Sequence, residues 1–235
     1  MIQCTSSLER RMCDAVSFCW NVFAIKVGSG LIPINKEASM QLQYAYLLKQ
    51  YIPLITFHPD DEFSIELETS VEVDGTWREI DIIFKGKRPS DNFSIAIEMK
   101  CYKEKASSGK PRGATDIFMK DVYFDLFLLE RYVHHKLVDK GVALVMNDLE
   151  RLVYPKSKSA KCWTYDISDH AVITPSQFNT PIGGKDVNFS LNNSYQFVWQ
   201  LHGKKQWFVE LETPKKAFKT DSQRVAFLVC SKFWW

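Results

Sequence analysis

The stretch IAIEMK, Ile95–Lys100, places two charged side chains inside an otherwise apolar segment. Its apolar residues predict a buried β-strand, and a strand alternates its side chains between the two faces of a sheet. Glu98 and Lys100 therefore share one face, and Met99 lies on the other. Burying such a charged pair costs several kcal/mol per ion unless something offsets that cost. A metal ion together with a phosphate is one candidate.

Two further strands are expected before this stretch. In 65–73 apolar residues alternate with polar ones, which is the pattern of a half-exposed strand. Asp and Gly at 74–75 predict a hairpin turn, and the next strand, 77–84, carries Asp81 between isoleucines. The solvent-facing positions of the first strand are expected to be Glu66, Glu68 and Glu72. Glu68 is the one of the three to reconsider as a site residue.

Helical patterns surround these strands. The segments 6–27, 35–50 and 114–136 have apolar residues at helical spacing, and Asn35 is expected to cap the second helix. A short buried strand at 142–146 follows, so the third helix becomes a crossover between parallel strands. The expected core positions are Val16, Cys19, Trp20, Phe23 and Val27, then Leu42, Tyr46 and Leu47, then Ile117, Val122, Leu126, Leu129 and Val133.

This order predicts an α/β fold with a central mixed sheet flanked by helices. The C-terminal part is less regular, but 195–201 and 206–211 predict a β-hairpin and 225–230 a last strand. No repeat or linker forces a division of the chain. We therefore expect one domain, with an additional N-terminal helix and a C-terminal hairpin. Its predicted limits are 1–235, with a core at about 35–147 and a C-terminal extension at 148–235.

Composition narrows the class of protein. The 235 residues are 46% hydrophobic, which is enough for one sizeable core, and the net charge of +2 does not by itself indicate a nucleic-acid partner. The apolar run 12–27 is interrupted by charged residues and too short to span a membrane, so we expect neither a signal peptide nor a membrane segment. No CxxC pair or Cys/His ligand spacing occurs, which favours a reducing, cytoplasmic setting. The cysteines are Cys4, Cys13, Cys19, Cys101, Cys162 and Cys230.

The acidic residues suggest a metal site. If the strands 77–84 and 93–100 are neighbours, Asp81 and Glu98 can converge on one divalent cation, with the Met99 carbonyl as a further oxygen ligand. Mg²⁺ suits such a site because it takes one or two carboxylates, keeps several waters and accepts phosphate oxygens.

These residues resemble a known family. Asp81, a gap of sixteen residues and then Glu98-Met99-Lys100, on a helix, three strands, helix, strand order, resembles the PD-(D/E)xK nuclease superfamily. That superfamily includes restriction endonucleases, Holliday-junction resolvases and DNA-repair exonucleases. The resemblance covers about 35–147, and Ile80 stands where the family name has a proline.

The resemblance implies a restriction endonuclease-like core and an Mg²⁺-dependent nuclease, with Mn²⁺ as a substitute metal. In that family the Asp and the Glu bind the metal and the Lys is catalytic, roles that fall on Asp81, Glu98 and Lys100. Many members add a Glu from the preceding helix, here Glu37, and some a Lys or Gln from the following helix, here Lys120. The expected reaction is hydrolysis of a phosphodiester bond, most simply in DNA, by a water activated near the lysine.

Several of these residues also have simpler explanations. Glu37 stands in the first turn of a helix, where the helix dipole alone favours an acid. Lys120 can pair with Asp116 along its own helix. The loop that follows Lys100 is basic and either contacts phosphates or is simply solvated. Its basic residues are Lys103, Lys105, Lys110 and Arg112.

Two other classes of protein compete with the nuclease. A non-catalytic nucleic-acid-binding module on the same fold would bind DNA without cleaving it. A structural α/β interaction protein would respond to neither DNA nor metal. A nuclease that cuts both strands would need either a homodimer or two successive events.

Overall fold

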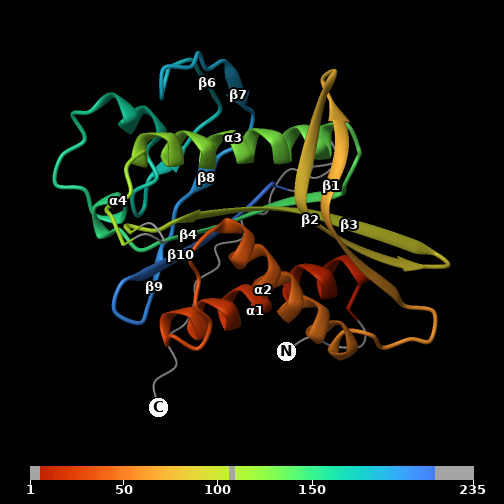
Figure 1. The fold of residues 1–235 in the computed structure, drawn as a ribbon. Coiled ribbons are helices and arrows are strands. Elements are labelled where there is room, and N and C mark those ends of the chain that lie inside the picture. The colour runs from red at the N-terminus through yellow and green to blue at the C-terminus, as the bar shows by residue number, and fades with distance from the viewer. Residues whose placement is uncertain (1–5, 106–108, 215–235) are drawn as a thin grey trace.

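The computed structural model describes residues 6–105 and 109–214 and is organised around a six-stranded mixed sheet (Figure 1). The strand order is β1-β2-β3-β4-β10-β9. Neighbouring strands are antiparallel except β3 and β4, which are parallel. The strands are β1 (Glu62–Val73), β2 (Thr76–Arg88), β3 (Asp91–Tyr102), β4 (Lys140–Asn147), β9 (Gln200–His202) and β10 (Gln206–Glu212). The predicted α/β class with a central mixed sheet is confirmed.

Helices cover both faces of the sheet (Figure 1). On one face lie α1 (Leu8–Gly28) and α2 (Glu37–Tyr51), and on the other lies α3 (Thr115–His134). The chain therefore has the predicted order of helix, three strands, helix and strand in α2, β1 to β3, α3 and β4. The remaining elements are short: η1 (Ile52–Leu54), α4 (Glu150–Val153), η2 (Lys161–Tyr165), β5 (Val172–Ile173), β6 (Ser176–Phe178), β7 (Phe189–Leu191) and β8 (Tyr195–Gln196).

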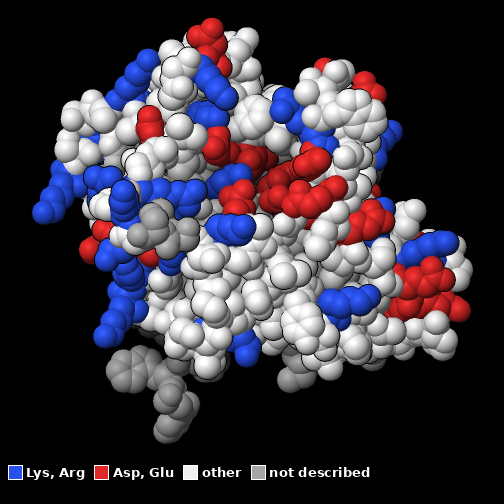
Figure 2. Space-filling view, in the orientation of Figure 1, with Lys and Arg blue, Asp and Glu red and all other residues white. Residues whose placement is uncertain are grey.

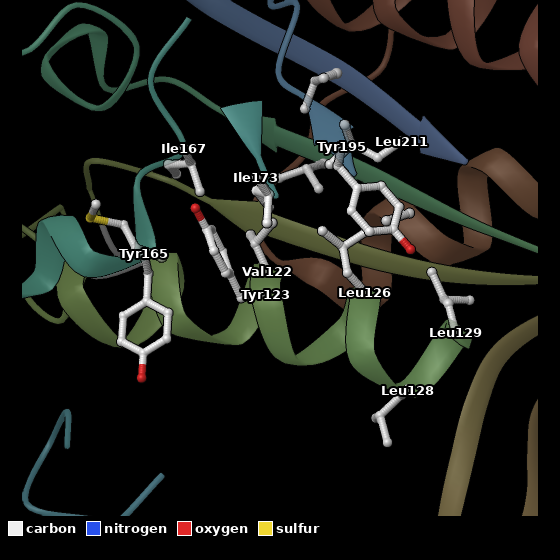
Figure 3. Packing of buried hydrophobic residues seen from close by; sticks show 14 of the residues in the cluster. Val122, Tyr123, Leu126, Leu128, Leu129, Tyr165, Ile167, Ile173, Tyr195 and Leu211 are labelled. Atoms are coloured by element: carbon white, nitrogen blue, oxygen red, sulfur yellow. The ribbon is translucent and has the colours of Figure 1, made fainter. Parts of the chain in front are cut away.

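The sheet separates two apolar cores. On the α3 face, Val122, Leu126 and Leu129 pack with residues of the C-terminal segment such as Ile173 and Tyr195 (Figure 3). On the opposite face, the side chains of α1 and α2 pack on alternate residues of β2, β3 and β4. The five predicted core positions of α1 are all buried, so this helix is an integral part of the layer that it forms with α2.

The prediction for α2 was wrong in two respects. Lys36, not Asn35, precedes the first helical residue. Leu42 and Tyr46 are 61% and 60% exposed, and the buried face is instead formed by Met40, Gln41, Tyr44, Ala45 and Leu48. An apolar periodicity selects the wrong face because the true inner face carries polar Gln41.

Other boundaries also differ from expectation. Ile117 is 38% exposed at the start of α3. The stretch 195–201 is not one strand, because β8 pairs with β5 whereas β9 pairs with β10. The hairpin of β9 and β10 is confirmed, and the strand expected at 225–230 lies outside the described residues. The cysteines of the described part are free thiols: Cys13, Cys19, Cys101 and Cys162.

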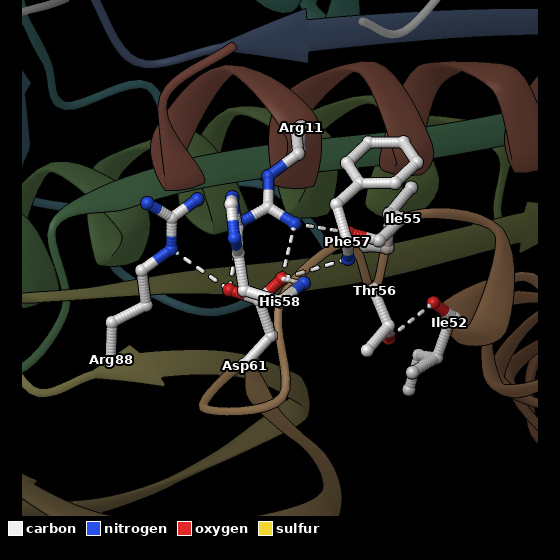
Figure 4. A network of polar contacts seen from close by, with 8 residues as sticks. All are labelled: Arg11, Ile52, Ile55, Thr56, Phe57, His58, Asp61 and Arg88. Carbon is white, nitrogen blue, oxygen red and sulfur yellow. Dashed lines mark hydrogen bonds and ion pairs between the residues drawn. The ribbon is translucent and has the colours of Figure 1, made fainter. Parts of the chain in front are cut away.

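A buried ionic network fastens α1 to the sheet (Figure 4). The Asp61 carboxylate accepts two hydrogen bonds from the Arg11 guanidinium, at 2.7 and 3.0 Å, and one from Arg88 Nε at 2.8 Å. The side chains of Arg11 and Asp61 are fully buried. Arg11 belongs to α1 and Arg88 to the end of β2, so this network joins the helix, the loop before β1 and the sheet.

Within the described residues, no helix is both long and apolar enough to cross a membrane.

Candidate functional site

The site forms where β2 separates from β3. The two strands pair as far as Ile82 opposite Ile97, and beyond that point β3 continues beside β4 alone. Glu68 of β1, which falls opposite Asp81, has a positive φ of 50° and no ladder partner. Ile80 and Ile83 consequently face the same core, although an unbroken strand would place them on opposite faces. The β1–β2 hairpin therefore bends away from the sheet at Asp81 (Figure 1).

Two carboxylates bind the edge of β3 that this bend leaves free. The Met99 N–H donates to Asp81 Oδ2 at 2.6 Å, and the Cys101 N–H donates to Glu37 Oε2 at 3.2 Å. Gln41, one turn after Glu37 in α2, donates to the Asp81 carbonyl oxygen at 2.7 Å. The start of α2 is therefore fixed against the opening between the strands.

Lys100 lies between two acids from opposite layers. Its Nζ is 3.3 Å from Glu37 Oε1 of α2 and 3.3 Å from Asp125 Oδ2 of α3. The side chains of Glu37, Lys100 and Asp125 are 39%, 20% and 11% exposed, so the site opens to solvent on the α2 side. Glu98 is deeper still, at 6% exposed, and its Oε1 has no hydrogen-bond partner among the described residues.

The carboxyl groups of the site are buried and outnumber its one ammonium group; both conditions raise their pKa values, and burial contributes most. Burial is the main cause that raises the pKa of Asp81 to about 6, against the opposing effect of the Met99 N–H. Burial, and then the neighbouring acids Asp125 and Asp81, raise the pKa of Glu98 well above its usual range. The pKa of Asp125 is also raised, chiefly by burial. The site therefore holds buried carboxyl groups that resist ionisation.

Lys100 shows the opposite balance. Burial lowers its pKa, but the carboxylates of Asp125, Glu37 and Asp81 outweigh burial and raise the pKa above the ordinary lysine value. Lys100 is therefore a firmly held ammonium ion near neutral pH. A band of acidic side chains crosses the middle of the visible face, with basic side chains gathered beside it toward α4 (Figure 2).

The structure brings together Asp81, Glu98, Lys100 and Glu37, as expected. Lys120 does not join them, because its ammonium contacts Asp121 and lies 5.7 Å from the Phe124 ring centre. The residue of this helix that contacts Lys100 is Asp125 instead.

Sequence reasoning missed two polar residues of the site. Asp125 interrupts the apolar stripe of its helix between Val122 and Leu129, and an acid on a buried helix face is the signal that could have identified it. Gln41 carried no comparable signal, because glutamine is common on exposed helix faces.

The basic loop is only partly free to bind phosphate. Lys103 Nζ pairs with Asp148 at 2.8 Å and its side chain is 15% exposed. The Arg112 guanidinium lies 5.9 Å from the Tyr102 ring centre. Lys105 and Lys110 are exposed. Phosphate contacts by this loop stay a prediction.

The oxygen atoms of the site determine whether it can hold a divalent cation. Within the described part of the chain, no group of three or more His, Cys, Asp or Glu side chains is arranged to hold a metal ion. Two carboxylates with waters suffice for Mg²⁺, and the unsatisfied buried oxygen of Glu98 has the right chemistry. An extended residue directs its N–H and C=O to the same side, so the Met99 carbonyl faces the same opening as its N–H. Asp81, Glu98 and Met99 therefore offer oxygen atoms of the kind that a hard cation accepts, and a metal ion held by them stays a prediction.

No protein-family model, curated protein or solved structure matches this chain.

Proposed function

We propose that this protein is a metal-dependent nuclease that hydrolyses phosphodiester bonds of nucleic acid, most simply DNA. In this proposal α2, β1 to β3, α3 and β4 form a restriction endonuclease-like core of the PD-(D/E)xK type. Asp81 and Glu98 hold the cation, and Lys100 acts on the phosphate. The order of elements and the shared location of these three side chains support the proposal.

The observation that carries it is the unsatisfied oxygen of Glu98. A buried polar atom without a hydrogen bond costs about 1 to 3 kcal/mol, and a charged one costs more. A purely structural Glu98–Lys100 pair would remove that cost by direct contact, yet the Lys100 ammonium is bound to Glu37 and Asp125 instead. Glu98 thus has no basic partner within the described part of the chain, although the Tyr132 hydroxyl of α3 acts on its carboxyl group. In this proposal its unpaired Oε1 takes the cation.

The surrounding residues have distinct chemical tasks in this proposal. A bound Mg²⁺ would polarise the phosphate and stabilise the charge that develops on it. Lys100, an ammonium whose position is fixed by two carboxylates, donates a hydrogen bond to a phosphate oxygen and neutralises charge. Its ammonium lies between two carboxylates, which suits an electrostatic task. Glu37 and Asp125 are positioning residues for Lys100.

The proposal is tested by nuclease assays on plasmid, linear and single-stranded DNA with Mg²⁺ or Mn²⁺. Lys100→Ala is expected to abolish cleavage while the circular dichroism spectrum stays unchanged. Lys120→Ala is the matched control, because Lys120 lies outside the Lys100 cluster and should retain full activity. Equal activity of the two variants would overturn the assignment of Lys100.

One observation favours a non-catalytic DNA-binding module instead. Asp81 Oδ2 is already bound to the Met99 N–H, which leaves this carboxylate one free oxygen for a cation. A binding module predicts salt-dependent DNA affinity with no cleavage in either metal and no metal affinity at Glu98. Isothermal titration with Mn²⁺, compared between the wild type and Glu98→Gln, separates the two functions. Whether the active species is a homodimer stays a prediction that sedimentation can check.

A further inference from the structure

A hollow lies between the start of α3 and the segment that contains α4 and η2. Its volume is about 660 Å³, and the lining residues that matter are Thr115, Met119, Arg151, Tyr154, Lys156 and Trp163. Pockets that bind small organic ligands typically enclose about 300 to 1,000 Å³, so this hollow is large enough for a nucleobase with its sugar.

The walls of this hollow combine aromatic surface with positive charge. Trp163 is partly buried. Lys158 lies outside the lining, with its Nζ 5.7 Å from the Trp163 ring centre and paired with Asp166 at 2.6 Å. Tyr154 is 51% exposed and meets Trp207 edge to face. Arg151 and Lys156 are exposed at the rim, where Glu150 is the one acid among the lining residues. Aromatic rings beside cations are the combination that proteins use to bind single-stranded nucleic acid.

Tyr102 follows Lys100 by two residues in β3 and packs under the basic loop, where the Arg112 guanidinium lies 5.9 Å from its ring centre. The Tyr102 hydroxyl donates to the Arg112 carbonyl oxygen at 2.7 Å. Burial raises the pKa of this hydroxyl, the charges of Arg151 and Arg112 lower it, and the charges of Asp148 and Glu104 raise it. Arg112 of the basic loop and Arg151 at the rim of the hollow therefore act on the same hydroxyl, and Asp148, which pairs with Lys103, offsets part of the positive charge there. Figure 2 shows basic side chains gathered on this side of the acidic band.

The helix α3 sets the distance between hollow and site. Met119 lines the hollow and Asp125 contacts Lys100, and six residues of α-helix span about 9 Å along the axis.

We propose that this hollow binds one base of a single DNA strand whose phosphates run from Arg151 and Lys156 toward Lys100. Trp163 stacks on the base, and the two cations contact the backbone on either side. The occupant is single-stranded because in a duplex the base faces are stacked on one another and cannot enter a pocket. The register relative to Lys100 rests on the proposed nuclease function, whereas the binding itself requires no cleavage.

The test is fluorescence anisotropy of labelled single-stranded and duplex oligonucleotides in EDTA, at several salt concentrations. Trp163→Ala should weaken single-strand affinity on the order of tenfold, Trp163→Phe should retain most of it, and Arg151→Ala should weaken binding and reduce its salt dependence. Arg10→Ala is the matched control, because Arg10 is an exposed arginine on α1 with 71% of its side chain accessible. It should bind as the wild type does.

The outcomes distinguish this inference from the proposed function. Unchanged affinity in folded Trp163→Ala and Arg151→Ala, or a duplex preference that persists in both, overturns the hollow as a base site. Because Arg151 and Lys156 are exposed, their alanine variants test the surface even if Trp163→Ala fails to fold. Selective loss of single-strand binding without cleavage by the wild type would support the hollow and overturn the nuclease. Cleavage by the wild type, with single-strand binding unchanged in the variants, would support the nuclease and overturn the hollow as a base site.

Discussion

Asp81→Asn is expected to stabilise the protein at neutral pH. The substitution keeps an oxygen that can accept the Met99 N–H bond, but it removes a buried charge. In the folded protein the pKa of Asp81 is about 6, against an ordinary value of 3.8 for the unfolded chain. Ionisation of this carboxyl group is therefore less favourable in the folded state, and wild-type stability decreases as the pH rises from about 4 to above 6.

The size of the effect follows from these two pKa values. Each tenfold difference in proton affinity is worth about 1.4 kcal/mol, so the full cost of the charge is about 3 kcal/mol at pH 7.5. At pH 4.5 most of the group is protonated in the folded protein, and the cost falls to about 1 kcal/mol. For a chain of this length, 3 kcal/mol corresponds to an increase in Tm of roughly 6 to 12 °C.

Urea unfolding of the wild type and Asp81→Asn at pH 7.5 and 4.5, without divalent metal, measures this difference. The free energy of unfolding should increase in the variant at both pH values, about three times more at pH 7.5. An equal gain at the two pH values, or a loss at pH 7.5, would refute the explanation by buried charge. The same variant should have no nuclease activity, so that stability and function change in opposite directions.

Three further predictions concern separate parts of the molecule. Asp125→Ala should reduce nuclease activity by about 10- to 100-fold, since it removes one of the two carboxylates that hold Lys100. Because the Asp125 carboxylate raises the pKa of Lys100, activity of the variant should decline at a lower alkaline pH than that of the wild type, which misfolding alone would not cause. Asp61→Ala should lower the free energy of unfolding in urea by roughly 3 to 5 kcal/mol, because it leaves the Arg11 guanidinium buried without its carboxylate partner. In the wild type, Arg11 is the first cause that lowers the pKa of Asp61, so the stability that this ion pair contributes is lost only as the pH falls to strongly acidic values. Gly28→Ala should lower the Tm, because a Cβ there would lie 2.6 Å from the backbone of His202, whereas Gly113→Ala, with nothing within 4 Å, should not.

The order of elements and the shared face of Glu98 and Lys100 were predictable, because apolar alternation reports directly which strand residues are buried. The bend at Asp81 was not, since it depends on the positive φ of Glu68, and no glycine or asparagine marks that position. Neither propensity nor periodicity predicts where two paired strands separate.

The polar side of the site was also hidden for a physical reason. Gln41 and Asp125 sit on buried helix faces, where they hydrogen-bond or pair with groups that are distant in sequence. Such contacts exist only after folding. A prediction of buried positions from the spacing of apolar residues therefore assigns Gln41 and Asp125 to the exposed face. The two-residue spacing of Glu98 and Lys100 needed no such information, because a strand sets it locally.

The placement of α1 has a consequence for the smallest part of this chain that can fold independently. The helix seals one face of β3 and β4, docks against the β9–β10 turn at Gly28 and is held at its other end by Asp61. A fragment limited to 35–147 would leave that sheet face open to water, and we expect such a fragment to aggregate. The autonomous folding unit therefore begins at about residue 6 and reaches β10, so that the two ends of the described chain must come together before this face of the sheet is covered.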